Sequence, residues 1–144
     1  MRIIIDADAC PSINLIENLA KTYNIELILV SDNTHNLHSD YANIIIVDKT
    51  FGSADIKIMN IVLENDIVVT QDYGVAVVCL SKHARVINPK GFIYNDKNMD
   101  TLLNIRQINS KLRKSKIHTK GPKKRTNEDD IRLINNLKFM INDS

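Results

Sequence analysis

The sequence predicts an α/β fold, a three-layer sandwich in which a mostly parallel central sheet of about five strands carries helices on both faces. The first observation is a set of short apolar runs, rich in Ile and Val and too short for helices, which are typical of buried strands in a parallel sheet. The second is that segments with helical spacing of apolar residues separate these runs, which favours right-handed βαβ units. The third is composition, since 144 residues with 44% hydrophobic and 25% charged residues fit a single soluble domain over residues 1–144.

The predicted strands are the five apolar runs, taken in chain order. They cover residues 3–5, 27–30, 44–47, 67–70 and 86–87. A polar residue or a turn signal follows each run, and Asn88-Pro89-Lys90-Gly91 is the clearest of these signals. The order of the strands in the sheet is not visible in this pattern.

Helices are predicted between the strands and at the C-terminal end. They begin at Pro11, Ser53, Tyr73, about Asn98 and Thr126. Pro11 suits a first helical turn, because its missing N–H is not needed there, and Ser53 suits an N-cap.

Two of these helices have a predicted buried face. In the helix after Ser53, the apolar residues Ile56, Met59 and Leu63 share one side. The last helix begins with a sequence that resembles a capping box, Thr126 with Asp129 three residues later. Its apolar residues are Ile131, Ile134, Leu137 and Ile141.

Acidic residues follow the predicted strands where they end. Asp6 and Asp8 come directly after the first strand, and Asp72 follows the fourth. Asp55 lies in the first turn of a predicted helix. Because the carboxyl ends of parallel strands meet at one edge of a sheet, we expect Asp6, Asp8, Asp55 and Asp72 to converge there. Clustered carboxylates favour a hard divalent cation, which predicts a Mg²⁺ or Mn²⁺ site.

Some of these acids have alternative structural roles. Asp72 can be the N-cap of the helix that follows it, and Asp55 can serve only the helix dipole. Asp32 and Asp48, which follow the second and third strands, favour a role as turn residues.

Charge is distributed unevenly along the chain. From Arg106 to Arg125 there are nine Lys and Arg residues and no Asp or Glu, although the net charge is only +2. The rest of the chain holds ten basic against seventeen acidic residues, about −7. We expect a basic loop near 113–126, in which Lys120, Lys123, Lys124 and Arg125 contact a nucleic-acid backbone. The alternative is a solvated run of lysines.

The remaining features are those of a cytoplasmic protein. No apolar run approaches the length of a membrane span, and no signal-peptide pattern opens the sequence. Cys10 and Cys79 have no metal-ligand spacing and suggest no disulfide framework.

The chain resembles a known family in several short motifs. Its opening run Asp6-Ala7-Asp8-Ala9-Cys10-Pro11 looks like the signature of the YaiI/YqxD family of bacterial proteins. The resemblance continues through residues 52–55, 69–72, 88–91 and 119–122, and so covers essentially the whole chain. That family is similar to the PIN-like domains, metal-dependent nucleases with a parallel α/β sandwich. The resemblance implies that Asp6, Asp55 and Asp72 occupy the positions of the nuclease acids, whereas Asp8 belongs to the family's own signature.

Three functions remain open. We expect first a Mg²⁺- or Mn²⁺-dependent nuclease acting on RNA, with Asp6, Asp8, Asp55 and Asp72 holding the metal. The second is a haloacid-dehalogenase-like phosphatase, which Asp6, Asp8 and Ser31 would suit although Ala9-Cys10-Pro11 departs from that class. The third is a non-catalytic RNA- or ribosome-binding module whose acids bind metal only for structure.

Overall fold

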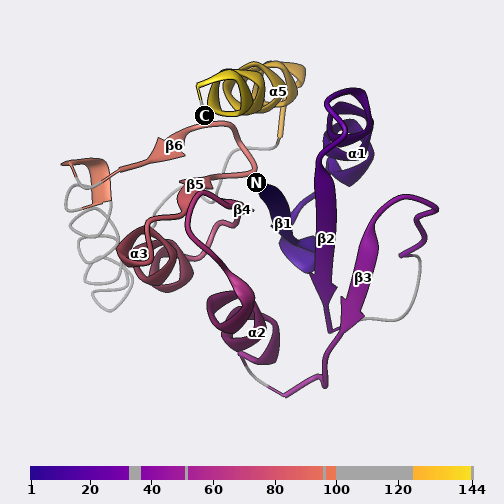
Figure 1. Cartoon of the computed structure of the whole chain (residues 1–144), viewed down its shortest axis with the longest axis vertical. Helices are drawn as coiled ribbons and strands as arrows, with labels where there is room; N and C mark the ends of the chain where they lie inside the picture. The colour runs from indigo at the N-terminus through magenta and orange to yellow at the C-terminus, as the bar shows by residue number, and fades with distance from the viewer. Residues whose placement is uncertain (33–36, 51, 96, 100–124, 144) are drawn as a thin grey trace, which may run out of the picture.

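Within the described residues, six strands form one sheet and helices cover both of its faces (Figure 1). This computed structural model describes residues 1–32, 37–50, 52–95, 97–99 and 125–143. The strands are β1 (Arg2–Asp6), β2 (Glu26–Ser31), β3 (Asn43–Ile46), β4 (Ile67–Val69), β5 (Arg85–Ile87) and β6 (Ile93–Tyr94). The helices are α1 (Ile13–Thr22), α2 (Ser53–Ile61), α3 (Tyr73–Ser81) and α5 (Asn127–Asn142), with a short 3-10 turn η1 (Ala7–Ala9) after β1. The predicted α/β sandwich is confirmed.

The strand order is β3-β2-β1-β4-β5-β6. The first five of these strands in the chain are parallel, and β6 pairs antiparallel with β5. Ile4 of β1 pairs with Ile28 of β2 on one side and with Val68 of β4 on the other. The strands β2 and β3 are therefore added on one side of β1, and β4, β5 and β6 are added on its other side. The direction in which strands are added reverses between β1 and β4. In such sheets the carboxyl ends of the two strands at this reversal form the usual ligand crevice.

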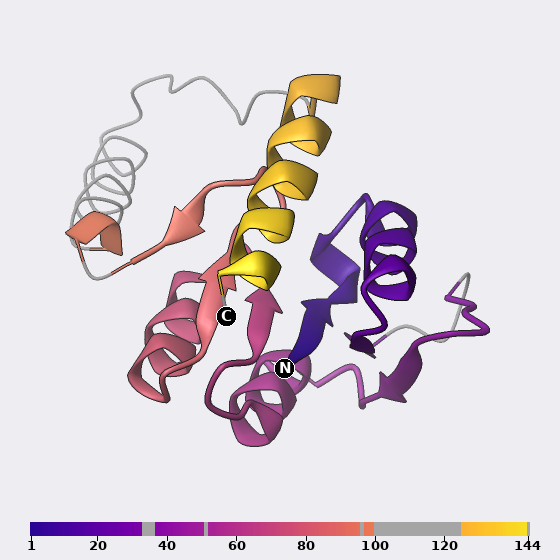
Figure 2. The ribbon, with the colours of Figure 1, turned by 45° about the horizontal axis from the view of Figure 1, so that its top comes forward.

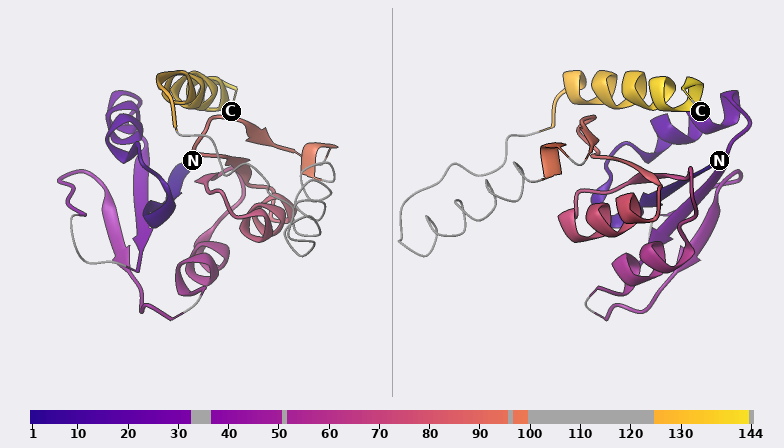
Figure 3. Two further views of the ribbon diagram at one scale, coloured as in Figure 1. Left: turned by 180° about the vertical axis from the view of Figure 1, so that it is seen from behind. Right: turned by 60° about the vertical axis from the view of Figure 1, so that its left-hand side comes forward.

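Alternate residues of the central strands pack into two cores, one on each face of the sheet. Ile3 and Ile5 face the core that α1 and α5 cover, and Ile4 faces the core under α2 and α3. The right-hand view of Figure 3 shows the sheet between these two layers. Ile3, Ile4 and Ile5 are all fully buried, which explains why β1 reads as an uninterrupted apolar run.

Helix α5 returns across the sheet and brings the two ends of the described chain together (Figure 2). Its first turn is at the carboxyl edge, where the Oγ of Ser12 donates a hydrogen bond to Asp130 Oδ1 at 2.6 Å. Its last turn is at the opposite edge, where Arg85 donates to the carbonyl of Met140. The predicted capping box is confirmed, because Thr126 and Asp129 each accept a hydrogen bond from the other's backbone N–H.

Four details of the sequence prediction need correction at the level of elements. Strand β6 is an additional strand, because two paired residues are too short to give a periodic signal. Pro11 is not in the first helical turn, because η1 intervenes and α1 begins at Ile13 with Ser12 as its N-cap. The N-cap of α2 is Gly52, whose φ of 78° suits glycine, and Ser53 is the first helical residue.

The fourth correction concerns which helix faces are buried. In α2 the fully buried residue is Ile58, and the predicted Met59 is partly buried against the same core. Ile56 is 54% exposed, and Leu63, which lies beyond the end of the helix, is 60% exposed. In α5 the predicted burial of Leu137 and Ile141 is confirmed, and Ile134 packs against the same core. The exception is Ile131, which is 60% exposed, and Leu133 and Met140 complete the buried face.

Two predicted segments fall largely outside the described residues. Of the helix predicted over 98–112, only Asn98 and Met99 are described, and both are helical. The basic loop near 113–126 is described from Arg125 onward. Across the described ranges, no helix combines the length and the apolar character needed to span a bilayer.

Candidate functional site

An open pocket of about 410 Å³ lies at the carboxyl edge of the sheet and is lined by four carboxylates. We call it the acid pocket. Its lining residues are Asp6, Asp8, Ala9, Asp32, Lys49, Thr50, Gly52, Ser53, Ala54 and Asp55. They come from the end of β1, from η1, from the residue after β2, and from the first turn of α2 with the loop before it. The pocket therefore collects acids from three separate parts of the chain beside the β1–β4 reversal.

Asp6 is the innermost of these acids. It is the last residue of β1 and is only 8% exposed. Burial is the main reason that the pKa of Asp6 rises to about 6, and the negative charges of Asp55, Asp8, Asp72 and Asp32 raise it further. A carboxylate in this position is destabilised near neutral pH unless a cation or a proton neutralises it.

Asp8 joins the ends of β1 and β2. Its carboxylate accepts a hydrogen bond from the Oγ of Ser31 at 2.5 Å and another from the backbone N–H of Asp32 at 2.8 Å. The contact between the carboxyl groups of Asp8 and Asp32 raises the pKa of Asp32. Asp32, which the sequence favoured as a turn residue, is thus part of the acid pocket. Asp48 lines a neighbouring groove instead, formed by the end of β3 and the side of α2 that carries Ile56, Lys57 and Asn60.

Asp55 and Asp72 are predicted site residues with different positions. Asp55 lies in the first turn of α2 and lines the acid pocket, and the pKa of Asp55 is raised by burial and then by the charge of Asp72. Asp72 is not among the lining residues. It is the N-cap of α3, where its Oδ1 accepts a hydrogen bond from the backbone N–H of Val75 at 2.9 Å. Its charge nevertheless acts on both Asp6 and Asp55, so it lies beside the pocket.

The donor set suits a hard divalent cation that is bound by few protein ligands. Within the described ranges, no three His, Cys, Asp or Glu side chains are grouped closely enough to hold a metal ion together. Mg²⁺ keeps several waters and is often held by one or two carboxylates plus substrate phosphates, so it does not need three protein ligands. Carboxylate oxygens facing one open pocket, with a buried Asp6 that resists ionisation, are consistent with that mode of binding.

Arg125 is the one predicted substrate-binding residue in the described part of the chain, and it is engaged within the protein. Its Nη2 forms an ion pair with Asp130 at 2.7 Å, its Nε donates to Ser12 at 3.2 Å, and its Nη1 donates to the carbonyl of Pro89. Since Ser12 follows β1 and Pro89 follows β5, Arg125 lies at the carboxyl edge. Lys120, Lys123 and Lys124 lie outside the described residues, and their contact with RNA stays a prediction.

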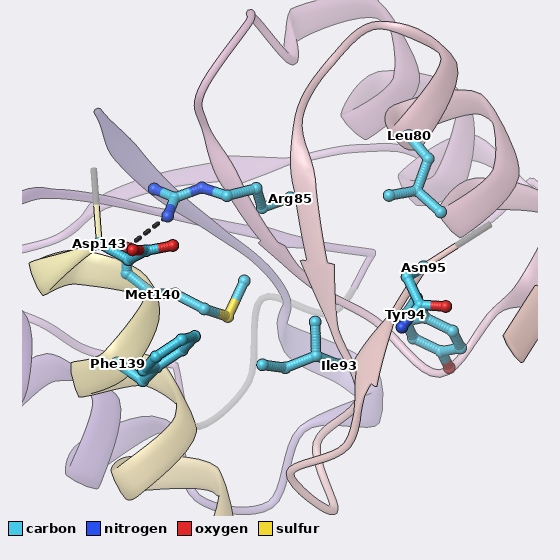
Figure 4. A pocket seen from close by; sticks show the side chains of 8 residues that line it. All are labelled: Leu80, Arg85, Ile93, Tyr94, Asn95, Phe139, Met140 and Asp143. Atoms are coloured by element: carbon cyan, nitrogen blue, oxygen red, sulfur yellow. Dashed lines mark hydrogen bonds between the residues drawn. The ribbon is translucent and has the colours of Figure 1, made fainter. Parts of the chain in front are cut away.

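A second pocket, of about 310 Å³, lies between β6, the end of α3 and the last turn of α5 (Figure 4). Its walls are mainly apolar and include Leu80, Ile93 and Phe139. Arg85 and Asp143 are the charged residues that line it, so it holds one carboxylate where the acid pocket holds four. The acid pocket is therefore the better candidate for phosphate chemistry.

Comparison with known proteins places the chain in a family. The model of the family described as "Uncharacterized BCR, YaiI/YqxD family" matches residues 4–143. The UPF0178 protein of Clostridium novyi (strain NT) is 51% identical over 142 residues, which is 99% of this chain and 95% of that protein. The UPF0178 proteins of Clostridium kluyveri (strain ATCC 8527) and Clostridium tetani (strain Massachusetts) are 53% and 48% identical over 141 residues, with 98% of this chain and 93% and 97% of those proteins covered.

None of these three names states an activity, so the function has to be argued from the site. No solved structure gives a significant match to the chain. The family match spans nearly the whole sequence and includes the opening motif that supplies Asp6 and Asp8. The chain belongs to the YaiI/YqxD (UPF0178) family.

Proposed function

We propose that this protein is a nuclease that depends on Mg²⁺ or Mn²⁺ and hydrolyses phosphodiester bonds of RNA in the acid pocket. The observation that carries the proposal is the convergence of Asp6, Asp8, Asp32 and Asp55 on one open pocket. Burying one carboxylate among others lowers stability, and sites that do this are commonly functional. A structural role alone does not account for the placement of Asp6, because its carboxylate accepts no hydrogen bond from the described residues, whereas that of Asp8 accepts two and that of Asp72 accepts one.

Each acid has a distinct task in this proposal. Asp6 and Asp55 would hold the cation, since both have a raised pKa and face the pocket. Asp8 is held in place by Ser31 and by the backbone of Asp32, so it would present a fixed carboxylate edge to the cation or to its waters. Asp72 would add negative charge from the N-cap of α3 without lining the pocket. When bound, the cation would activate water and stabilise the leaving oxygen.

The test is cleavage of a short fluorescein-labelled single-stranded RNA, with Mn²⁺, with Mg²⁺ and with a chelator. The wild-type protein should cleave it only with metal, and Asp6→Asn should lower the rate at least about 100-fold. Asp48→Asn is the matched control, because Asp48 is an exposed acid of the neighbouring groove. It should stay within about twofold of the wild-type rate.

The two alternatives give different results in the same experiment. A binding module would bind the RNA equally well with Asp6→Asn and would show no turnover with any metal. A phosphatase is favoured by one observation, the hydrogen bond between Ser31 and Asp8, because these are two of the three residues that such an enzyme would use. It would release phosphate from a small phosphomonoester and form a beryllofluoride adduct at Asp6, whereas a nuclease would do neither.

A further inference from the structure

The acid pocket contains a positively charged side chain, Lys49, which the sequence did not single out. Lys49 lies in the loop between β3 and α2, and it lines the pocket together with the four carboxylates. Its neighbours in the wall are Thr50, Gly52 and Ser53. Lys49 therefore faces the same cavity as Asp6 but comes from a different part of the chain than the basic segment near 113–126.

The charge of Lys49 is not used in an ion pair within the described residues. Each of the arginines Arg2 and Arg125 is held by a carboxylate at 2.7 Å, by Asp66 and Asp130 respectively. No carboxylate in the described ranges lies within 4.0 Å of the Lys49 ammonium. Lys49 is exposed and acts on the pocket at longer range, where its charge partly offsets the rise in the pKa of Asp32 that the contact with Asp8 causes. An exposed ammonium with no carboxylate partner remains available to an anionic ligand that enters the cavity.

A polyanion that enters the acid pocket meets four carboxylates, and their repulsion opposes binding. A cation in the same wall offsets this repulsion at the point where a phosphate would lie. Lysine binds phosphate as a compact point charge with three donors, and this contact does not require a bound metal. The structural alternative is that Lys49 only offsets the charge of Asp32.

We propose that Lys49 binds a backbone phosphate of the RNA in the acid pocket and so places the scissile bond against Asp6 and Asp55. This inference rests on the proposed nuclease function. It assigns substrate binding at the site to Lys49, in addition to the basic residues predicted near 113–126.

The test compares Lys49→Met, Lys49→Arg and Lys57→Met. Lys57 is the matched control, because it lies on α2 and lines the neighbouring groove with Asp48, outside the acid pocket. The dissociation constant of a short fluorescein-labelled single-stranded RNA is measured without metal at salt concentrations from about 50 to 200 mM. Cleavage of the same RNA is then measured with Mn²⁺. Thermal unfolding of each variant confirms that an exposed lysine has been changed without loss of the fold.

Lys49→Met should flatten the slope of log Kd against log salt by about 0.7, the loss of one contact to a single strand. It should also lower kcat/KM about 10- to 100-fold. Lys49→Arg should keep most of the salt slope and most of kcat/KM. Lys57→Met should match the wild-type protein in both quantities. The slope separates the two roles, because a lysine that only offsets the charge of Asp32 loses no phosphate contact when it is replaced.

The outcomes also separate this inference from the nuclease function. If Lys49→Met and Lys57→Met have the same salt slope, the role of Lys49 is overturned whether or not the RNA is cleaved. If the wild-type protein binds RNA with the predicted slopes but never cleaves it, Lys49 is a phosphate-binding residue and the nuclease function fails. If the wild-type protein does not bind RNA at about 50 mM salt, both are overturned.

Discussion

At the scale of single residues, the acid pocket brings together carboxylates from three separate parts of the chain. Asp6 and Asp8 stand out because two carboxylates directly follow a buried strand, and both line the pocket. Asp32 has the same local pattern as an ordinary turn residue, an acid after a strand and before a polar loop. Its place beside Asp8 comes from the pairing of β1 with β2, in which Asp6 lies opposite Val30. Only the register of the two strands contains that information.

The first residue-scale prediction concerns the stability of the metal-free protein and Asp6. The folded-state pKa of about 6 lies above the usual 3.8, so between these values the folded state binds more protons than the unfolded state. The free energy of unfolding should therefore fall as pH rises from about 4 to about 6 and stay lower above that range. After an allowance for solvent screening, the loss is on the order of 1–2 kcal/mol.

Urea denaturation of the wild-type protein and of Asp6→Asn, with chelator present, measures this effect. The variant should be more stable than the wild-type protein at about pH 8 and nearly equal to it at about pH 4. Asp48→Asn should follow the wild-type curve. A variant that is less stable than the wild-type protein at about pH 8 would show that the Asp6 carboxylate is a structural acceptor.

At the scale of elements, the strands were easier to predict than the buried faces of the helices. The strands β1, β2, β4 and β5 are short apolar runs buried on both sides, and this pattern has few alternatives. Helix α2 has apolar residues around much of its circumference. The spacing of Ile56, Met59 and Leu63 therefore does not identify which side of the helix is buried against the sheet. The sheet selects Ile58, which is fully buried. Packing against β1 and β2, rather than periodicity, decides the orientation of this helix.

The corrected face of α2 gives an element-scale prediction. Ile58→Ala should lower the free energy of unfolding by about 2–4 kcal/mol, because it removes buried methylene groups and leaves a cavity. Ile56→Ala is the matched control on the same helix, and since Ile56 is 54% exposed it should cost less than about 1 kcal/mol. Urea denaturation of both variants gives the two values. Equal losses at the two positions would contradict the described orientation of α2.

At the scale of the whole molecule, the strand order determines where the acids meet. The sequence predicted parallel strands but not the order β3-β2-β1-β4-β5-β6, because connection lengths alone do not say on which side of β1 the fourth strand adds. That choice places the end of β4 next to the end of β1, and the charge of Asp72 then reaches Asp6. Helix α5 closes the opposite side of the same edge, where Arg125 connects the end of the basic segment to Ser12 and Pro89. The acid pocket and Arg125, the described end of the basic segment, therefore lie at one edge of the sheet.

The proposed function requires that the acid pocket binds a divalent cation. Paramagnetic broadening of backbone amide NMR signals by Mn²⁺ measures this binding directly. At sub-stoichiometric Mn²⁺, the signals of residues 6–9, 32 and 52–55 should broaden first. Asp6→Asn should weaken this broadening, and Asp48→Asn should leave it unchanged. Broadening centred elsewhere, for example at Asp129 and Asp130, or no selective broadening at equimolar Mn²⁺, would contradict cation binding in the acid pocket.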